Sequence, residues 1–471
     1  MARSRVALAS TTGRVALSKD RVFICSCASV VSETQFADGR FRVRSPRGSC
    51  MVRAARLRWP PMTPENRQSR LGALGASSRE RVHGSLAAVA GVGRALEVFD
   101  RPWWLYRARG AIPHLDVVFR DPVPPAEPDV ALCRRLIDAY VLAQADAPAP
   151  TGMWSHGIFE QRQRELVRAL DRGDPTVLAE RLAGMFRSDF VLGMAPGSLG
   201  VGRRPAMLQR LGSLTTLSKL VSLAESQGVA RVENPEQGAA GVGLENGVDA
   251  LVRSLETHLE ISLDFPDVGA AYGVMAAGRL ITPETPDQVY AAARLREAIG
   301  KHLADRPEPL RVVEIGGGYG GMAYWLLRMV DSTVRYVVID LPVVNVLQGY
   351  FLSQALGHTV VSLYGEETGP VSIVPGHALS SVETPFDALV NKDSMPEMAP
   401  GAASSYLSWA RSACNGIFYS YNQEAAASFA GTPQIVVPEV LGQIGGFTRI
   451  SRDVSWLRRG YAEEIYVIGS L

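Results

Sequence analysis

The chain has 471 residues, enough for two or three domains, and its 46% hydrophobic and 20% charged residues are typical of a globular protein. No apolar run approaches the ~18 residues that a membrane-spanning helix needs, so the sequence excludes an integral membrane protein of that kind. Five cysteines provide no disulfide framework and indicate a reducing, cytoplasmic compartment.

The net charge of +2 is unevenly distributed. Residues 1–60 hold 12 basic and 3 acidic side chains, whereas the rest of the chain holds 37 and 44. This mildly acidic body argues against nucleic-acid or membrane-surface partners. Residues 1–60 lack sustained periodicity, and we interpret them as a basic, mostly disordered leader. An organellar targeting segment, or a start site at Met51 or Met62, is the alternative.

From residue 61 to 305 the sequence predicts a mainly helical region. Asp174 followed by Pro175 is a typical helix start, and the Gly, Asn and Pro residues of 228–247 indicate a break. Apolar residues recur at helical spacing in five segments, which are 129–146, 159–170, 175–186, 245–264 and 287–304.

Residues 306–471 have a different pattern, in which short β-branched runs alternate with helical segments. This alternation predicts an α/β domain with a mostly parallel sheet covered by helices on both faces. The expected strands are 311–315, 334–339, 371–374, 386–390, 417–421, 447–451 and 465–468.

A glycine-rich loop follows the first of these strands. Its sequence, Gly316-Gly-Gly318-Tyr-Gly320-Gly321, would let the backbone approach a ligand closely at a helix N-terminus. Asp340 ends the next strand, where its carboxylate can accept hydrogen bonds from ribose hydroxyls. The spacing fits a dinucleotide (G-x-G-x-x-G) as well as S-adenosylmethionine. Glu314 favours S-adenosylmethionine, because a carboxylate suits its ammonium and sulfonium and not a pyrophosphate.

Four motifs together resemble the sugar O-methyltransferase family, a branch of the class I S-adenosylmethionine-dependent methyltransferases. They are Glu-Ile-Gly-Gly-Gly-Tyr-Gly-Gly (314–321), Ile-Asp-Leu-Pro (339–342), Asn-Lys-Asp-Ser-Met-Pro-Glu-Met (391–398) and Tyr-Ser-Tyr-Asn-Gln-Glu (419–424). The resemblance covers residues 270–471. It implies a Rossmann-like sheet of seven strands with a reversed final strand. It also implies S-adenosylmethionine as cofactor, with Leu341 and Asn391 beside the cofactor-binding residues already named.

Methyl transfer to a hydroxyl requires alignment of the two reactants and benefits from a general base. Asp393, just past the strand 386–390, is the first candidate for the base, followed by Glu397 and His377. Asn391, Asp393 and Glu397 could instead cap the next helix. His377 could be structural or hold the adenine. No His/Asp cluster has metal-ligand spacing, although carboxylates that meet in the fold could hold a divalent ion.

The expected acceptor is a sugar or glycoside hydroxyl, and Asn422, Gln423 and Glu424 are its candidate contacts, with a polar turn as the alternative interpretation. His258 and Tyr272 are further candidates, and the helical region 61–305 would cover the acceptor or form a homodimer. Three other functions stay open: O-methylation of a phenolic or polyketide hydroxyl, nicotinamide-dependent oxidoreduction, and cofactor binding without catalysis.

Overall fold

The computed structural model divides the chain into two compact units, residues 1–87 and 88–471. The described residues are five strand segments within 14–52, and residues 115–469 apart from 146, 148–156, 192, 196–205, 238–240, 331–332, 427 and 430–431. The first unit contains a two-stranded and a three-stranded antiparallel sheet, which the sequence pattern does not predict. Their strands are β1 (Arg14–Ser18), β2 (Arg21–Cys25), β3 (Glu33–Ala37), β4 (Arg40–Ser45) and β5 (Gly48–Val52).

The second unit is built on an eight-stranded sheet with the order β11-β12-β10-β9-β13-β14-β18-β17. The pairs from β11 to β14 are parallel, and β18 runs antiparallel to both of its neighbours. This confirms the mostly parallel sheet and its reversed final strand. The strands are β9 (Leu310–Ile315), β10 (Val334–Asp340), β11 (Val361–Ser362), β12 (Val371–Pro375), β13 (Phe386–Lys392), β14 (Cys414–Gln423), β17 (Phe447–Val454) and β18 (Tyr461–Ile468).

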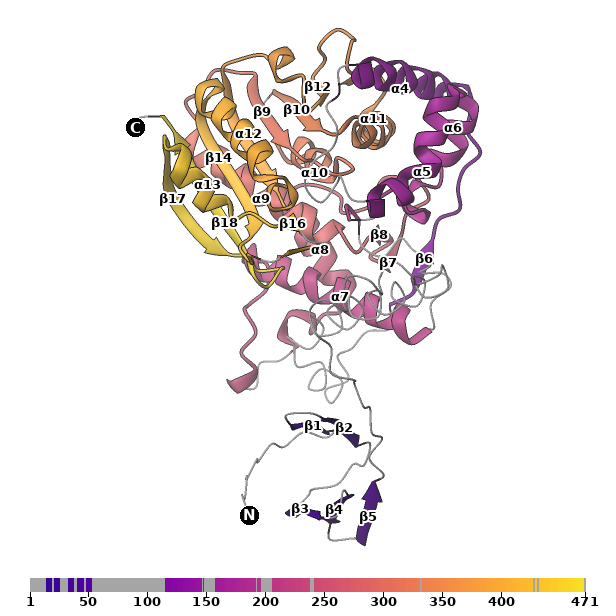
Figure 1. Cartoon of the computed structure of the whole chain (residues 1–471), viewed down its shortest axis with the longest axis vertical. Helices are drawn as coiled ribbons and strands as arrows, with labels where there is room; N and C mark the ends of the chain where they lie inside the picture. The colour runs from indigo at the N-terminus through magenta and orange to yellow at the C-terminus, as the bar shows by residue number, and fades with distance from the viewer. Residues whose placement is uncertain are drawn as a thin grey trace, which may run out of the picture. The chain divides into compact units, whose positions relative to one another are not determined.

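Helices cover both faces of this sheet (Figure 1). Successive side chains of a strand point to opposite faces, and here neighbouring residues enter two different cores. Val312 packs with the helices of one face, whereas Val313 packs with those of the other. The first face carries α9 (Thr285–His302), α10 (Gly321–Met329) and α11 (Pro342–Leu356), and the second carries α12 (Pro400–Ala413) and α13 (Val437–Ile444).

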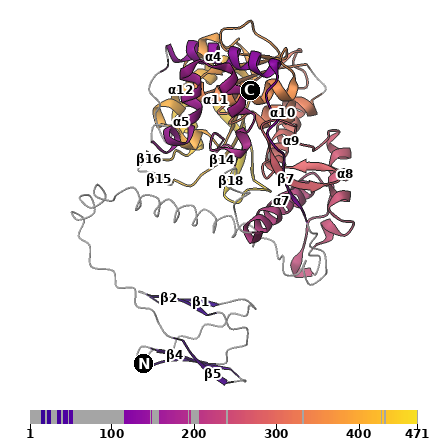
Figure 2. The same cartoon turned by 90° about the vertical axis from the view of Figure 1, so that its right-hand side faces the viewer.

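The described part of residues 115–305 is mainly helical, and it packs on the first face. Its core is continuous with that of α9, α10 and α11, because Leu136 and Leu217 belong to the same buried cluster. Figure 2 shows its later helices beside a small antiparallel sheet. The elements are α4 (Glu127–Ala145), α5 (Gly157–Arg172), α6 (Pro175–Leu182), α7 (Ala206–Ser226), α8 (Val248–Leu259), β6 (Val117–Phe119), β7 (Tyr272–Ala276) and β8 (Arg279–Ile281).

Two features of this region were not predicted. Helix α7 carries apolar residues around most of its circumference, so it lacks the one-sided pattern that indicates a surface helix. The hairpin β7–β8 is buried on both sides and lacks alternation. Among the described residues, no helix is long and apolar enough to cross a membrane.

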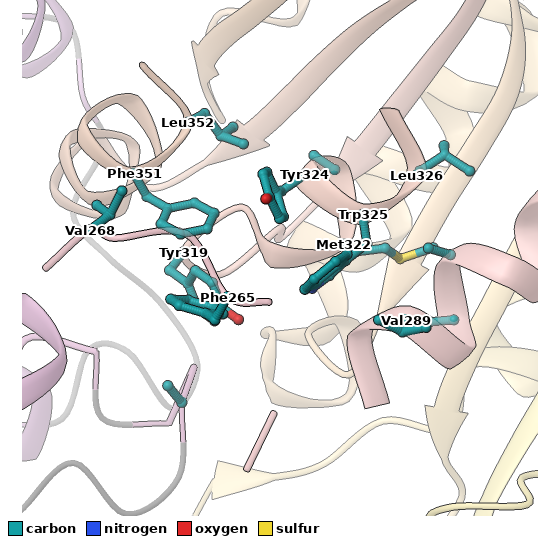
Figure 3. Close-up of a cluster of buried hydrophobic side chains, with 14 of the residues drawn as sticks. Phe265, Val268, Val289, Tyr319, Met322, Tyr324, Trp325, Leu326, Phe351 and Leu352 are labelled. Atoms are coloured by element: carbon teal, nitrogen blue, oxygen red, sulfur yellow. The ribbon is translucent and has the colours of Figure 1, made fainter. Parts of the chain in front are cut away.

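An aromatic cluster joins the glycine loop to the helical region (Figure 3). Tyr319 of the loop is 1% exposed, and its ring meets Phe351 of α11 edge-on with centroids 5.0 Å apart. Phe186 packs edge-on against Tyr319 and Phe265, at 5.1 and 5.3 Å. Such pairs contribute about 0.5–1.5 kcal/mol each beyond the area they bury. They hold the loop in place between the sheet and its helical cover.

Candidate functional site

The glycine loop connects β9 to α10 through three residues with positive φ. Gly316, Gly318 and Gly320 have φ of +73°, +58° and +93°, a region that favours glycine. A Cβ at Gly316 would lie 2.0 Å from Ser394 Oγ, so the backbone of the loop touches the segment after β13. Only glycine fits this position, in conformation and in space.

Glu314 supports this loop from beneath. Its side chain is 1% exposed, and it accepts a hydrogen bond from the Tyr336 hydroxyl at 3.0 Å. A Cβ at Gly317 would lie 2.9 Å from its Oε2, so the carboxylate lies directly against the loop backbone. Burial raises the pKa of Glu314 to about 7, against the opposing effects of Tyr336 and Lys392. A cation bound near this carboxyl would favour its charged form.

Asp340 ends β10 beside the loop, as predicted. Its Oδ1 accepts a hydrogen bond from the Leu341 amide and its Oδ2 one from Gln348 Nε2, both at 2.8 Å. The Gly318 amide also donates to this carboxyl, so the ends of β9 and β10 meet. Burial raises the pKa of Asp340 to about 7. Asn345 donates to Gln348 at 2.9 Å, and its own Oδ1 is buried without a hydrogen-bond partner among the described residues.

The residues after β12 form the next part of this edge. The Gly376 amide donates to the Asp340 carbonyl at 2.8 Å, and the Tyr406 hydroxyl donates to the Gly376 carbonyl at 3.2 Å. His377 meets the ring of Tyr364 edge-on, at 6.5 Å between centroids. Its Nε2 is buried and has no hydrogen-bond partner within the described part of the chain. A ligand at this edge could supply the missing partner.

Asn391 ties the end of β13 to the glycine loop. It is fully buried, and its Nδ2 donates to the Ile315 carbonyl at 2.7 Å and to Ser394 Oγ at 2.6 Å. Its Oδ1 accepts a hydrogen bond from the Met395 amide at 3.3 Å. Glu397 ends the following turn and is partly exposed. The expected capping of the next helix is not formed, because the N-cap residues are Ser394 for Met395–Glu397 and Ala399 for α12, both without a side-chain capping bond.

Comparisons with known proteins give only a distant likeness. No family model matches the chain, and no curated protein matches it. A 1,6-didemethyltoxoflavin-N1-methyltransferase from Burkholderia thailandensis, solved with S-adenosylhomocysteine, is 21% identical, with a TM-score of 0.28 over 38% of this chain and 77% of its own. A magnesium protoporphyrin IX methyltransferase from Synechocystis PCC 6803 is 14% identical, with a TM-score of 0.28 over 39% and 87%.

The strand order of the sheet itself decides the fold. Counted from β9 and without the two-residue edge strand β11, the order is 3-2-1-4-5-7-6 with strand 7 reversed. The chain has the Rossmann-like fold of the class I methyltransferases. In this methyltransferase fold ligands lie beyond the carboxyl ends of the parallel strands, where Asp340, His377 and the glycine loop meet. Membership of the sugar O-methyltransferase family stays a prediction.

The base and two of the acceptor contacts predicted from the sequence already have partners within the protein. Asp393 has φ of +58°, and its carboxylate binds Arg458 at 2.5 Å and the Tyr461 hydroxyl at 2.7 Å. Asn422 is 4% exposed and accepts from the Asp393 amide at 3.0 Å. Glu424 pairs with Arg452 at 2.6 Å.

The remaining candidates for acceptor contacts are Gln423, Tyr272 and His258. Gln423 donates to Gln434 at 3.1 Å. Tyr272 stacks on Phe119 at 5.6 Å, and His258 lies in the last turn of α8. Among the described residues, no three His, Cys, Asp or Glu gather in a way that could hold a metal ion.

A buried ion pair at the same edge was missed by the sequence analysis. Lys392, at the end of β13, lies 2.7 Å from Asp287 of α9, and the two side chains are 8% and 1% exposed. The Tyr421 hydroxyl donates to Asp287 at 3.2 Å. Burial would raise the pKa of Asp287, but Lys392 and Arg458 outweigh it and hold the pKa below its usual range. No local motif indicates this pair, because its members are 105 residues apart.

Proposed function

We propose that this protein is an S-adenosylmethionine-dependent O-methyltransferase acting on a hydroxyl of a sugar or glycosylated metabolite. One observation carries the proposal. A glycine loop with a carboxyl beneath it and a second carboxyl at the end of the next strand meet at the ligand-binding edge of this fold. The sugar acceptor is supported by the resemblance of the four motifs and by the polar character of the residues after β13 and β14.

The side chains of this edge fit the cofactor. Asp340 would accept hydrogen bonds from the ribose hydroxyls, and the free amides at the start of α10 would face the amino-acid end. Asn345 Oδ1 and His377 Nε2 are buried without partners in the described structure, as expected of atoms that bond a ligand. When bound, the cofactor supplies an electrophilic methyl group on a sulfonium. The residues of the chain then have to align the acceptor oxygen and remove its proton.

The cofactor proposal can be tested by titration calorimetry. We expect S-adenosylhomocysteine to bind, and Asp340→Ala to weaken that binding by more than ~1 kcal/mol, because charged hydrogen bonds are lost. Asp453→Ala is the matched control, since Asp453 is 55% exposed on the far strand β17. Tighter binding of NAD than of S-adenosylhomocysteine would overturn the proposal in favour of an oxidoreductase.

The proposal of a sugar acceptor is tested by detecting a methylated product. The protein is incubated with S-adenosylmethionine and a panel of nucleotide sugars, glycosides, phenols and polyketides, and mass spectrometry detects the mass of one added methylene. We expect products among the sugars and glycosides. Products confined to the phenols or polyketides would keep the methyltransferase and refute the sugar acceptor. A protein that binds S-adenosylhomocysteine and methylates nothing in the panel would support cofactor binding without catalysis.

We also propose that the enzyme works in the cytoplasm and that its helical region covers the acceptor and can form a homodimer. The proposal follows from the sparse cysteines and from the first face of the sheet, which is buried under α4 and its neighbours. Light scattering with size-exclusion chromatography measures the molecular mass. A mass equal to one chain at micromolar concentration would refute the homodimer.

A further inference from the structure

Glu284 is a buried carboxyl that the sequence analysis did not single out. It is the residue before α9 and is 8% exposed, and its Oε1 has no hydrogen-bond partner among the described residues. Gln288, one turn further along α9, is 7% exposed and its Oε1 is likewise buried without a partner there. A buried acceptor without a donor costs free energy, about 1–3 kcal/mol each. Two such acceptors on one helix face point to a ligand that supplies donors.

Glu284 lies three residues before Asp287, which contacts Lys392 at the end of β13 at 2.7 Å. Four charged residues act on Glu284 from four elements: Lys219 of α7, Asp287 of α9, Lys392 of β13, and Arg458 between β17 and β18. Glu284 and Asp287 act in turn on the hydroxyl of Tyr319, the loop residue drawn in Figure 3. Burial raises the pKa of Glu284 above its usual value, and Asp287 adds to this, whereas the three cations oppose it.

The carboxylates of Asp287 and Asp393, in contrast, already have partners within the protein. Asp287 is paired with Lys392 at 2.7 Å and bonded by Tyr421. Both oxygens of Asp393 already accept hydrogen bonds, from Arg458 and Tyr461. A proton acceptor needs an oxygen that can reach the acceptor hydroxyl without breaking such bonds. Glu284 Oε1 has no such bond to break among the described residues.

We propose that Glu284 is the group that takes the proton of the acceptor hydroxyl during methyl transfer. The inference rests on the proposed function. The hydroxyl oxygen forms a bond to the methyl carbon as the carbon–sulfur bond breaks, and the electron pair of that bond stays on sulfur as a neutral thioether. The hydroxyl proton passes to the ionised Glu284 carboxylate, which becomes the neutral acid. Atoms and charge balance, with ether, S-adenosylhomocysteine and protonated Glu284 as products.

The positive charge of the sulfonium allows this proposal to be tested by the proton release that accompanies cofactor binding. A cation near Glu284 favours the ionised carboxylate, so S-adenosylmethionine should displace a proton that Glu284 holds in the free protein. S-adenosylhomocysteine lacks the sulfonium charge and should displace less. Calorimetry in buffers of different ionisation enthalpy measures the number of protons released. We expect a larger release with S-adenosylmethionine at pH values below the raised pKa of Glu284.

Substitutions test whether Glu284 causes this difference in proton release. Glu284→Gln should reduce the difference in proton release and leave the part that comes from Glu314 and Asp340, while S-adenosylhomocysteine still binds within about threefold. Glu297→Gln is the matched control, because Glu297 lies on the same helix, is 50% exposed and should keep the difference. Glu284→Asp should keep it with a shifted pH dependence, which serves if the Gln variant does not fold. A difference that is as large in Glu284→Gln as in the wild type, or that is absent from the wild type, would overturn the inference.

Turnover on an acceptor from the product screen gives a second measurement. Glu284→Gln should lower kcat by roughly 10²-fold or more and remove the rise of kcat with pH. If Asp393→Asn removes that rise and Glu284→Gln does not, Asp393 is the base and the inference is wrong. If neither S-adenosylmethionine nor S-adenosylhomocysteine binds the wild type, the proposed function itself is refuted. Failure of the inference and failure of the proposed function are therefore distinguishable.

Discussion

Single carboxyl groups at the edge of the sheet are buried at a cost that a cationic ligand can offset. Glu314 and Asp340 both have a pKa raised to about 7, chiefly by burial. Each is bonded to one neighbouring side chain, Tyr336 or Gln348, and neither forms an ion pair in the described structure. Such groups are close to half-ionised near neutral pH, so a bound cation can change their charge. The residues suit a ligand that carries positive charge.

The raised pKa of Glu314 predicts how stability depends on pH. The folded pKa of about 7 exceeds the ordinary value of 4.5, so between these values the folded state holds the proton more strongly than the unfolded state. Stability should therefore fall as pH rises from about 4.5 to about 7, by about 3 kcal/mol from this residue. Glu314→Gln keeps the shape and does not ionise, so denaturant melts across this range should show a smaller fall. An equal fall in both proteins would contradict the prediction.

Gly316 offers a second test at the scale of one residue. Gly316→Ala would force a Cβ to within 2.0 Å of Ser394 Oγ at a φ of +73°, and we expect a loss of about 1–3 kcal/mol of stability with weaker S-adenosylhomocysteine binding. Gly401→Ala is the matched control, because Gly401 lies in α12 with no atom within 4 Å of its Cβ position. That change should be neutral or slightly stabilising. Thermal melts and calorimetry measure both, and equal effects would refute the argument.

Helix α9 connects the helical cover to the carboxyl edge of the sheet. Its Asp287 reaches Lys392 of β13, and its Tyr290 donates to the buried Glu463 of β18. Arg294, one turn further, also contacts Glu463, at 3.1 Å. One helix thus positions charges against two strands that are far from it in sequence.

Breaking the pair between α9 and β13 should be costly. Asp287→Asn leaves Lys392 buried and charged without its partner, and we expect a loss of about 3 kcal/mol in denaturant melts. Glu165→Gln removes a pair with Arg181 in which the side chains are 64% and 52% exposed, and it should cost less than about 1 kcal/mol. The double variant Asp287→Asn with Lys392→Met should recover part of the loss. Similar values for the buried and the exposed pair would contradict this account.

At the scale of the whole molecule, the parts predicted from sequence are those with local signals. The strand, glycine loop and helix around Gly316 were found because they are contiguous, and Asp340 because it ends the next strand. Their conformations follow from neighbouring residues. Lys392, Asp287 and Glu284 were missed because only the packing of α9 across the sheet brings them together. In sequence they resemble ordinary solvated charges, and nothing local distinguishes a buried carboxyl from an exposed one.

The first unit provides the last prediction, which is that residues 1–60 are dispensable. Their 12 basic side chains outnumber the 3 acidic ones and repel one another, and residues 88–471 form a compact unit of their own. A chain that begins at Met62 should therefore keep its melting temperature and its affinity for S-adenosylhomocysteine. A chain that begins after α4 is the contrast, because it removes buried Leu132 and Leu136 from the core against α11 and should melt several degrees lower. A comparable drop for the Met62 chain would show that the first 61 residues stabilise the rest.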